Sequence, residues 1–206
     1  NVMTSDRLYP LILASASPRR RELLEQIGLW FTVQPVDTDE TPRSGEAPDL
    51  YVLRMAREKA LACQALAGNA GSLVLGADTS VVLDNAIMGK PRDRNDAREM
   101  LMRLSGQAHE VMTGVALAGP TAVREKVVTT RVAFRRLAGD EIEAYLDSGE
   151  PYDKAGGYGI QGRGSIFVTS LSGSYSAVVG LPLDATAELL AQAAHPVWRW
   201  WVAADE

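Results

Sequence analysis

The sequence has few of the residues that form disulfides or bind metals through sulfur and imidazole. Its one cysteine, Cys63, cannot form an intramolecular disulfide, and we expect it to fill space in the core. The two histidines, His109 and His195, lie far apart in sequence, without a cysteine or a paired-carboxylate pattern nearby. We therefore do not expect a histidine-based zinc site or a Ser/His/Asp triad.

Long apolar runs and an excess of positive charge are also missing. No stretch of about 18 apolar residues occurs, and residues 1–10 lack the apolar segment of a signal peptide, so we expect a cytoplasmic protein that does not enter membranes. The net charge is −5 and the sequence pI is about 5.2, which disfavours a nucleic-acid binder that uses a broad basic face. A local basic pocket stays compatible with this balance.

The composition is that of a globular protein with a sizeable core. Of the 206 residues, 46% are hydrophobic and 23% are charged, and no Pro/Ser-rich linker divides the chain, so we expect one domain over residues 1–206. Position 1 is Asn rather than Met, and we expect residues 1–7 to be disordered or foreign to the natural chain. Residues 195–206 form a tail whose three tryptophans we expect to pack on the body or on a partner subunit.

Expected strands and helices are mixed along the whole length. Apolar residues at helical spacing predict helices over residues 19–28, 49–66, 93–104, 140–146 and 183–193. Segments rich in Val, Leu and Thr predict strands over residues 8–14, 72–83, 110–118, 125–137, 166–171 and 176–179. The turn signal Asp84-Asn85 predicts a hairpin. This mixture favours an α/β fold with a mixed sheet.

The first candidate site is the segment SASPRRR, residues 15–21, between an expected strand and an expected helix. Free backbone N–H groups at the helix start, two hydroxyls and clustered guanidinium groups all favour an oxyanion, so a phosphate would bind here. The alternative is that Ser17 only caps the helix and the arginines are solvated. No GxxxxGK[ST] pattern occurs in the chain, so we do not expect a P-loop nucleotide hydrolase.

The second candidate is Asp78, which interrupts an apolar strand. Burying a carboxylate is costly unless it is paired or bound to a metal, so Asp78 is a candidate for chemistry. The alternative is an ion pair with a nearby basic residue. Asp37, Asp39 and Glu40 precede a Thr-Pro turn and could supply a second carboxylate, or could form only a solvated acidic loop.

Two further candidates are the glycine-containing segments GKPRD, residues 89–93, and DKAGGYGIQG, residues 153–162. Glycines let a backbone approach a ligand closely, and a lysine or glutamine among them offers a point charge or an amide. Without context, either segment could be only a loop.

Taken together, these segments resemble the Maf family of nucleotide pyrophosphatases. The match runs in order through LILASASPRRRELL (11–24), VLRMAREKA (52–60), LGADTSVVLD (75–84), GKPRD (89–93), LSGQAHEVMTGVAL (104–117), DKAGGYGIQG (153–162) and VVGLPL (178–183). The resemblance implies an elongated mixed sheet flanked by helices, similar to that of inosine triphosphatases. It also implies two lobes with a central cleft, and a homodimer.

The motifs GADT and DKAGxYGIQG resemble those of the family branch that acts on dTTP and UTP rather than on 7-methyl-GTP. This implies hydrolysis of a pyrimidine nucleoside triphosphate to the monophosphate and pyrophosphate. By resemblance, Asp78 is the proton acceptor, and Arg19, Thr79 and Gln161 determine substrate specificity.

Attack of water at the α-phosphorus must overcome the charge of the triphosphate, so we expect a divalent cation, Mg²⁺ or Mn²⁺, and several basic groups. We assign Glu40 and Asp78 to the metal; whether Asp78 is a base, a metal ligand or both is left open. The residues assigned to phosphate binding are Ser15, Ser17, Arg20, Lys59 and Lys90.

The amide of Gln161 could complement the N3–H donor and the carbonyl acceptors of uracil and thymine. Cytosine has no N3–H and would leave these partners unmatched. An alternative function is a nucleotide-sensing regulator of septum formation without essential catalysis, because Maf proteins are also associated with septum arrest. A nucleic-acid binder is a weaker third hypothesis, which the acidic charge disfavours.

Overall fold

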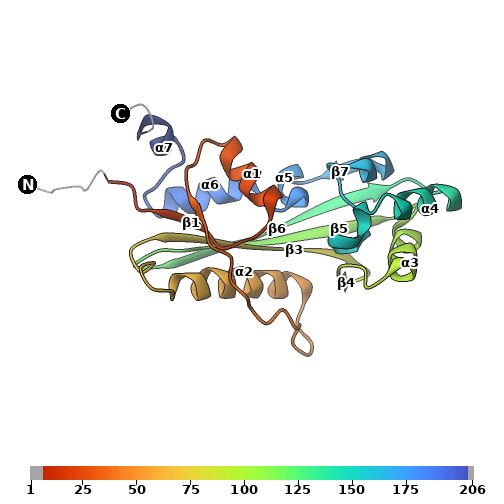
Figure 1. Ribbon diagram of the computed structural model, residues 1–206, viewed down its shortest axis with the longest axis horizontal. Helices are drawn as coiled ribbons and strands as arrows, with labels where there is room; N and C mark the ends of the chain where they lie inside the picture. Colours follow the sequence, from red (N-terminus) through yellow and green to blue (C-terminus); the bar gives the residue numbers. More distant parts are fainter. Residues whose placement is uncertain (1–6, 204–206) are drawn as a thin grey trace, which may run out of the picture.

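The computed structural model describes residues 7–203, so the expectation for residues 1–7 falls, apart from Arg7, outside the described part of the chain. The described chain forms one long seven-stranded sheet flanked by helices (Figure 1). The strand order is β2-β1-β3-β5-β6-β7, and β4 pairs with β3. The strands are β1 (Leu11–Leu13), β2 (Thr32–Val33), β3 (Leu73–Leu83), β4 (Ala86–Met88), β5 (Ala108–Ala118), β6 (Val123–Phe134) and β7 (Val168–Ser172).

The sheet is mixed, as the sequence predicts. Strand β1 runs parallel to β2 and β3, whereas the β3–β4, β3–β5, β5–β6 and β6–β7 pairs are antiparallel. The predicted hairpin is confirmed, because Asp84 and Asn85 join β3 to β4 with φ values of 50° and 62°. Asn and Asp tolerate this left-handed region better than most residues, which makes them suitable for a two-residue hairpin turn.

The helices confirm five predicted segments and correct one. They are α1 (Pro18–Gln26), α2 (Pro48–Gln64), α3 (Arg94–Leu104), α4 (Gly139–Asp147), α5 (Tyr175–Val179), α6 (Leu183–Gln192) and α7 (Trp198–Ala203), with the short 3₁₀ helices η1 (Glu150–Asp153), η2 (Ala155–Gly157) and η3 (Arg163–Phe167). The strand predicted over residues 176–179 is wrong, because this segment forms α5. The Ser174 hydroxyl caps α5 by accepting the Ala177 N–H at 3.1 Å, and four residues are too few for a period to be read.

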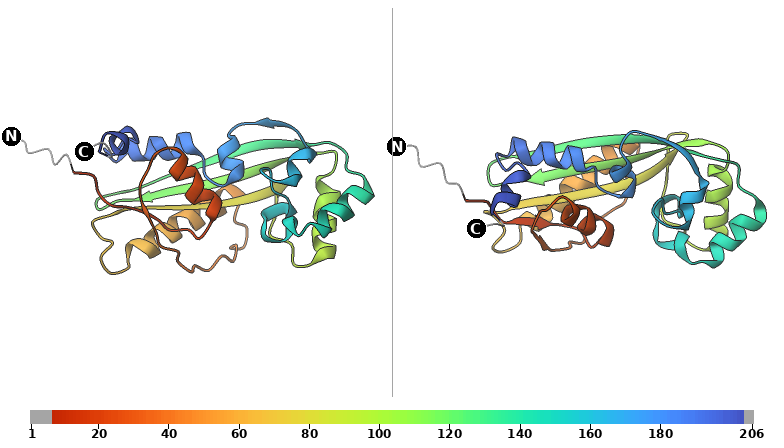
Figure 2. Two further views of the ribbon diagram at one scale, coloured as in Figure 1. Left: turned by 45° about the horizontal axis from the view of Figure 1, so that its top comes forward. Right: turned by 90° about the horizontal axis from the view of Figure 1, so that it is seen from above.

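The helices cover the sheet on both faces. In Figures 1 and 2, α2 lies against one face, and α1, α5 and α6 lie on the opposite side. Helices α3 and α4 gather at one end of the long axis, and α7 lies at the other end. Within residues 7–203, no helix has the length and apolar character needed to cross a membrane.

The two ends of the molecule have separate apolar clusters that share strands. One cluster contains Leu75 of β3 and Val115 of β5, together with residues of β1, α1, α6 and α7. The other contains Val81 of β3 and Val111 of β5, together with residues of α3, α4 and β6. Strands β3 and β5 therefore run through both clusters, and the site described below lies between them.

Two glycines bring α2 into direct contact with the sheet. A Cβ atom added at Gly76 would lie 2.3 Å from the carbonyl oxygen of Ala56, and one added at Gly114 would lie 2.4 Å from that of Val52. No side chain fits between the helix and these strands. The depth of α2, and with it the position of Lys59, is therefore set by backbone contact.

The tryptophan tail packs on the body of the protein, as expected, but not completely. Trp200 is fully buried in the cluster that contains α1 and α6. The Trp201 indole N–H donates a hydrogen bond of 2.7 Å to the carbonyl of Ile27, just beyond the end of α1. Trp198 keeps 59% of its surface exposed.

His109 is expected to make folding stability depend on pH. It lies 2% exposed in the cluster around α3 and α4, with Nε2 2.6 Å from the Tyr158 hydroxyl oxygen. Burial lowers its pKa from 6.5 to about 4. Between pH 6.5 and pH 4, His109 is therefore protonated in the unfolded chain but neutral in the folded protein. The stability contribution of neutral His109 is complete above pH 6.5 and is lost as the pH falls toward 4.

Urea unfolding at pH 7 and pH 4 measures this effect. Wild type should lose about 3 kcal/mol more unfolding free energy over this range than His109→Gln. Parallel pH profiles for the two proteins would contradict the assignment.

Candidate functional site

The candidate site lies along an open edge of β3. One edge of β3 pairs with β5 over nearly its full length. The other edge pairs with β1 at residues 73–75 and with β4 at residues 81–83, and no strand in the described chain occupies it at residues 76–80. Asp78 and Thr79 lie in this gap and line a cleft of about 760 Å³.

All of the residues that were assigned a role in the site line this one cleft, and of the three acidic candidates before the Thr-Pro turn only Glu40 does so. They come from the β1–α1 loop, the loop before α2, helix α2, strand β3 and the two glycine-containing segments. The lining includes Ser15, Ser17, Arg19, Arg20, Glu40, Lys59, Asp78, Thr79, Lys90 and Gln161. Their individual roles stay predictions, but the cleft brings them together from segments up to about 145 residues apart.

An acidic pair bridged by a lysine forms the centre of the cleft. Lys59 Nζ lies 3.0 Å from Asp78 Oδ1 and 3.2 Å from Glu40 Oε1. Asp78 therefore forms the ion pair with a nearby basic residue that the alternative predicted, and its role in chemistry stays a prediction. The pair is not sealed in the interior, because the side chains of Asp78 and Lys59 are 14% and 13% exposed and both face the cleft.

Burial and charge act in opposite directions on Asp78. Burial raises the pKa of its carboxyl above the usual value, and the Lys59 ammonium partly offsets this. A raised pKa makes an ionised carboxylate a better proton acceptor. Asp78 therefore combines exposure to the cleft with increased basicity.

Helix α2 holds the loop that carries Glu40. The Tyr51 hydroxyl donates to the Glu40 carbonyl oxygen at 2.6 Å, and Arg54 donates to the Thr41 carbonyl at 3.1 Å. Arg54 Nε also lies 2.6 Å from Glu46 Oε2, and this hydrogen bond holds the pKa of Glu46 at about 2. The Glu40 backbone is thereby fixed beside the cleft, while its side chain stays 62% exposed.

Arg20 connects α1 to β3 and to the loop after α5. Its Nε donates to the Gly180 carbonyl at 2.7 Å, and its Nη2 donates to the Thr79 hydroxyl at 3.1 Å. Burial lowers the pKa of Arg20, and Asp78 acts in the opposite direction. A guanidinium remains charged at neutral pH and has five N–H groups, so three are left for a ligand.

The segment before α1 combines capping with free donors. Ser17 caps α1 by accepting the Arg20 N–H at 3.3 Å, which confirms the predicted cap. The other half of that alternative, that the arginines are solvated, is wrong for Arg20, which is hydrogen-bonded to Gly180 and Thr79. The Ser15 hydroxyl accepts the Ser17 N–H at 3.1 Å. Neither hydroxyl donates to another described residue, so both can still donate to a phosphate in the cleft.

The two glycine-containing segments meet at one wall of the cleft. The Gly156 N–H donates to the Gly89 carbonyl at 3.1 Å, and Gly156 has a φ of +72° that few other residues adopt. Three cleft residues, Arg19, Lys90 and Gln161, make no side-chain hydrogen bond or ion pair within residues 7–203. Their polar groups are free to bind a ligand.

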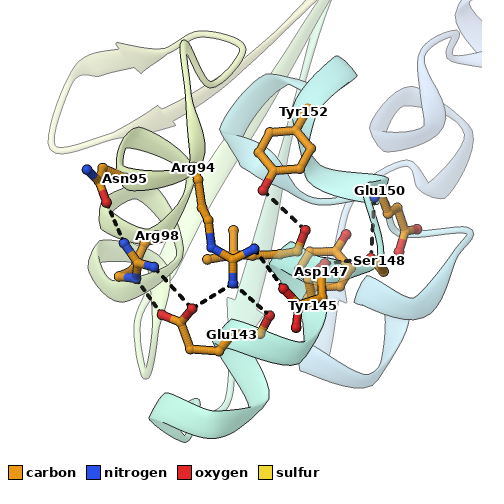
Figure 3. Close-up of polar contacts among 10 residues, drawn as sticks. Arg94, Asn95, Arg98, Glu143, Tyr145, Asp147, Ser148, Glu150 and Tyr152 are labelled. Atoms are coloured by element: carbon orange, nitrogen blue, oxygen red, sulfur yellow. Dashed lines mark hydrogen bonds and ion pairs between the residues drawn. The ribbon is translucent and has the colours of Figure 1, made fainter.

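The turn that carries Gln161 is fixed by the region after α3. The Tyr145 hydroxyl accepts the Gly159 N–H, and Glu150 Oε2 accepts the Arg163 N–H, both at 3.1 Å. Figure 3 shows Tyr145 and Glu150 beside the ion pairs that join α3 to α4, where Arg94 and Arg98 contact Glu143.

Comparison with known proteins identifies the family of this chain. The family model described as Maf-like protein matches residues 10–193. The chain belongs to the Maf family.

Its relatives within the Maf family include proteins named dTTP/UTP pyrophosphatase. That of Anaeromyxobacter sp. (strain Fw109-5) is 53% identical over 194 residues and covers 92% of each chain. That of Myxococcus xanthus (strain DK1622) is 54% identical over 190 residues, which is 92% of this chain and 95% of the relative. That of Pseudoalteromonas translucida (strain TAC 125) is 56% identical over 178 residues, 86% of this chain and 94% of the relative. Among solved structures, the Staphylococcus aureus Ham1 protein matches 61% of this chain and 71% of its own, with 13% identity and a TM-score of 0.42.

Three residues that support the cleft of this Maf protein, Tyr51, Arg54 and Thr113, were not predicted from the sequence. Tyr51 could have been found, because it shares one face of α2 with Met55 and Lys59 at four-residue spacing. For Arg54 the sequence shows only an i,i+4 spacing to Glu58, which is common on helix surfaces, whereas its pairing with Glu46 in the loop before α2 has no such signal. Thr113 lies within a Maf motif, and its role depends on its position opposite Thr79 in the β3–β5 register.

Proposed function

We propose that this Maf protein hydrolyses dTTP and UTP to the nucleoside monophosphate and pyrophosphate with the help of a divalent cation. The observation that carries the proposal is the position of Asp78. It lies on the open edge of β3, held by Lys59, in a cleft that Arg20 and Lys90 also line. The three relatives, all more than half identical to this chain, support the choice of substrates by their names.

The acidic pair fits a divalent cation that is shared with the substrate. Asp78 and Glu40 both contact the Lys59 ammonium, so both carboxylates can reach a single cation. Residues 7–203 hold no group of three or more His, Cys, Asp and Glu side chains suited to a metal. Mg²⁺ sites with one or two carboxylates are completed by substrate phosphates. When bound, Mg²⁺ or Mn²⁺ would neutralise phosphate charge and polarise the reacting phosphoryl group.

The remaining steps belong to residues of this chain. Arg20 and Lys90 bind the phosphate oxygens, and the hydroxyls of Ser15 and Ser17 donate to them. Arg19 contributes to substrate specificity. Asp78 accepts a proton as the water oxygen bonds to the α-phosphorus, and the bond from the α-phosphorus to the bridging oxygen breaks, releasing pyrophosphate. Lys59 keeps Asp78 ionised and adds positive charge near the phosphates.

A nucleotide panel tests the proposal. Purified protein with Mg²⁺ or Mn²⁺ is incubated with dTTP, UTP, CTP, the purine triphosphates and 7-methyl-GTP, and released pyrophosphate is measured. The expected result is one pyrophosphate per dTTP or UTP consumed and none without metal. If every nucleotide stays intact with either metal, the proposal is wrong.

Gln161 is expected to contribute to base selection. Gln161→Leu should lower kcat/KM for UTP about 10- to 100-fold and change that for CTP little, because a uracil-matched amide is lost. Steady-state kinetics with both nucleotides measure this change. Equal losses for UTP and CTP would place Gln161 in phosphate binding instead.

We also propose a homodimer, in line with the family resemblance, and light scattering of the purified protein checks it. The septum-formation role, the cytoplasmic location and the absence of nucleic-acid binding stay predictions.

A further inference from the structure

A chain of three hydrogen bonds runs from the cleft into the interior. Arg20 Nη2 donates to Thr79 Oγ1 at 3.1 Å, Thr79 Oγ1 lies 3.0 Å from Thr113 Oγ1, and Thr113 Oγ1 donates to the Ala177 carbonyl oxygen at 2.8 Å. These three hydrogen bonds join α1, β3, β5 and α5. Thr113 is fully buried, and Thr79 lines the cleft.

The donor and the acceptor of each hydrogen bond can be assigned by starting from the buried end of the series, at Ala177. A carbonyl oxygen can only accept, so the single hydroxyl hydrogen of Thr113 is used on Ala177. Thr113 can then only accept from Thr79, which uses the single hydroxyl hydrogen of Thr79. Arg20 has only N–H donors and occupies one lone pair of Thr79. The second lone pair of Thr79 Oγ1 is left to accept a hydrogen bond from a ligand in the cleft.

The backbone fixes this arrangement. Thr79 and Thr113 are direct partners in the antiparallel β3–β5 register. Their β-branched side chains have few rotamers, and cross-strand threonine pairs are well placed for a hydroxyl contact. Ala177 lies in α5, whose start is capped by Ser174. Buried on all sides, Thr113 has no water to accept its hydrogen in place of Ala177.

We propose that Thr113 is a positioning residue that makes Thr79 a hydrogen-bond acceptor toward the substrate base. This inference rests on the proposed function. The acceptor selects uracil and thymine, whose N3–H it accepts while the Gln161 amide donates to a ring carbonyl. It rejects cytosine, whose N3 carries a lone pair that would face the lone pair of Thr79. The specificity of Thr79 therefore depends on a residue that the substrate never touches.

Thr113→Val tests the proposal because valine keeps the shape and removes the hydroxyl. The Thr79 hydrogen then has no buried acceptor and can turn to the cleft, where it can donate to cytosine N3. The expected result is a fall of at least about tenfold in the UTP-to-CTP ratio of kcat/KM, with the value for CTP rising. Loss of fold alone would lower both values and would not raise that for CTP.

Two further variants of the same position separate the hydroxyl from the packing. Thr113→Ser keeps the hydroxyl and should restore the wild-type ratio. Thr113→Ala removes it with less bulk than valine and should shift the ratio in the same direction as valine, so the test survives if one variant fails to fold.

Thr186→Val is the matched control. Thr186 is also fully buried, and its hydroxyl donates to the Pro182 carbonyl at 2.8 Å, but it lies in α6 and does not line the cleft. The same kind of hydrogen bond is lost, and the UTP-to-CTP ratio should not change.

Binding of α,β-imido analogues of UTP and CTP, measured by calorimetry, gives a second readout that needs no hydrolysis. A Thr113→Val ratio within twofold of wild type, in kinetics or in binding, would overturn the inference, as would a Thr113→Ser variant that behaves like valine. If wild type hydrolyses no nucleotide, the proposed function fails, and the binding ratio still decides the role of Thr113.

Discussion

Asp78→Asn is expected to lower kcat/KM for dTTP and UTP by about 10³-fold while the protein stays folded. Asparagine has nearly the same shape, but it cannot accept a proton and is a poor ligand for Mg²⁺. Burial raises the pKa of Asp78 in the folded protein, so above the unfolded value of 3.8 the ionised carboxylate opposes folding. Removing that charge should leave the melting temperature at pH 7 unchanged or higher, as measured by circular dichroism.

Glu143→Gln is the matched control for this prediction. Glu143 is also an ion-paired carboxylate, but Arg98 and Arg94 lower its pKa to about 2, and it joins α3 to α4 (Figure 3). Its contribution to stability is present above pH 4.5 and is lost as the pH falls toward 2, so Glu143→Gln should lower the melting temperature at pH 7. Activity should be kept, because Glu143 does not line the cleft. Less than a tenfold loss in Asp78→Asn would contradict the catalytic role. A cell-division phenotype that survives in a hydrolysis-deficient Asp78→Asn strain would favour the regulatory alternative.

Gly114→Ala is expected to destabilise the protein by about 3 kcal/mol, which corresponds to a fall of about 6 to 12 °C in the melting temperature. The added Cβ atom would lie 2.4 Å from the Val52 carbonyl oxygen and 2.8 Å from the Leu53 nitrogen. These are backbone atoms of α2, so no flexible side chain can move aside. The whole helix must shift, and because it carries Lys59, kcat/KM should fall as well.

Gly139→Ala provides the control for this substitution. Gly139 is the first residue of α4, and a Cβ atom there would meet no heavy atom within 4 Å. Alanine also favours helix over glycine, so stability should be equal or slightly higher. If Gly114→Ala has the same melting temperature as wild type, the contact between α2 and the sheet is looser than the distances indicate.

Elements with a local cause could be predicted from the sequence, and elements with a non-local cause could not. Ser17 and Pro18 start α1 through a cap and a fixed φ angle, both properties of adjacent residues. The error at α5 arose because its start depends on Ser174, outside the apolar segment that was interpreted as a strand.

The same distinction applies to the site. Motifs identified residues that the fold brings to the cleft, including Asp78 and Gln161. Their mutual contacts depend on packing over long sequence distances. Lys59 reaches Asp78 because Gly76 and Gly114 allow α2 to approach, and Thr79 meets Thr113 through a register between strands that α3 separates in sequence.

The continuity of β3 and β5 through both apolar clusters limits how the cleft can close. A hinge needs a short connection that can change its dihedral angles, whereas here two paired strands of 11 residues each span the molecule. Rotation of one end against the other would break their hydrogen-bonded ladder. We therefore expect the two ends of the molecule to keep their relative position when a nucleotide binds, with the sheet acting as a rigid base for the cleft.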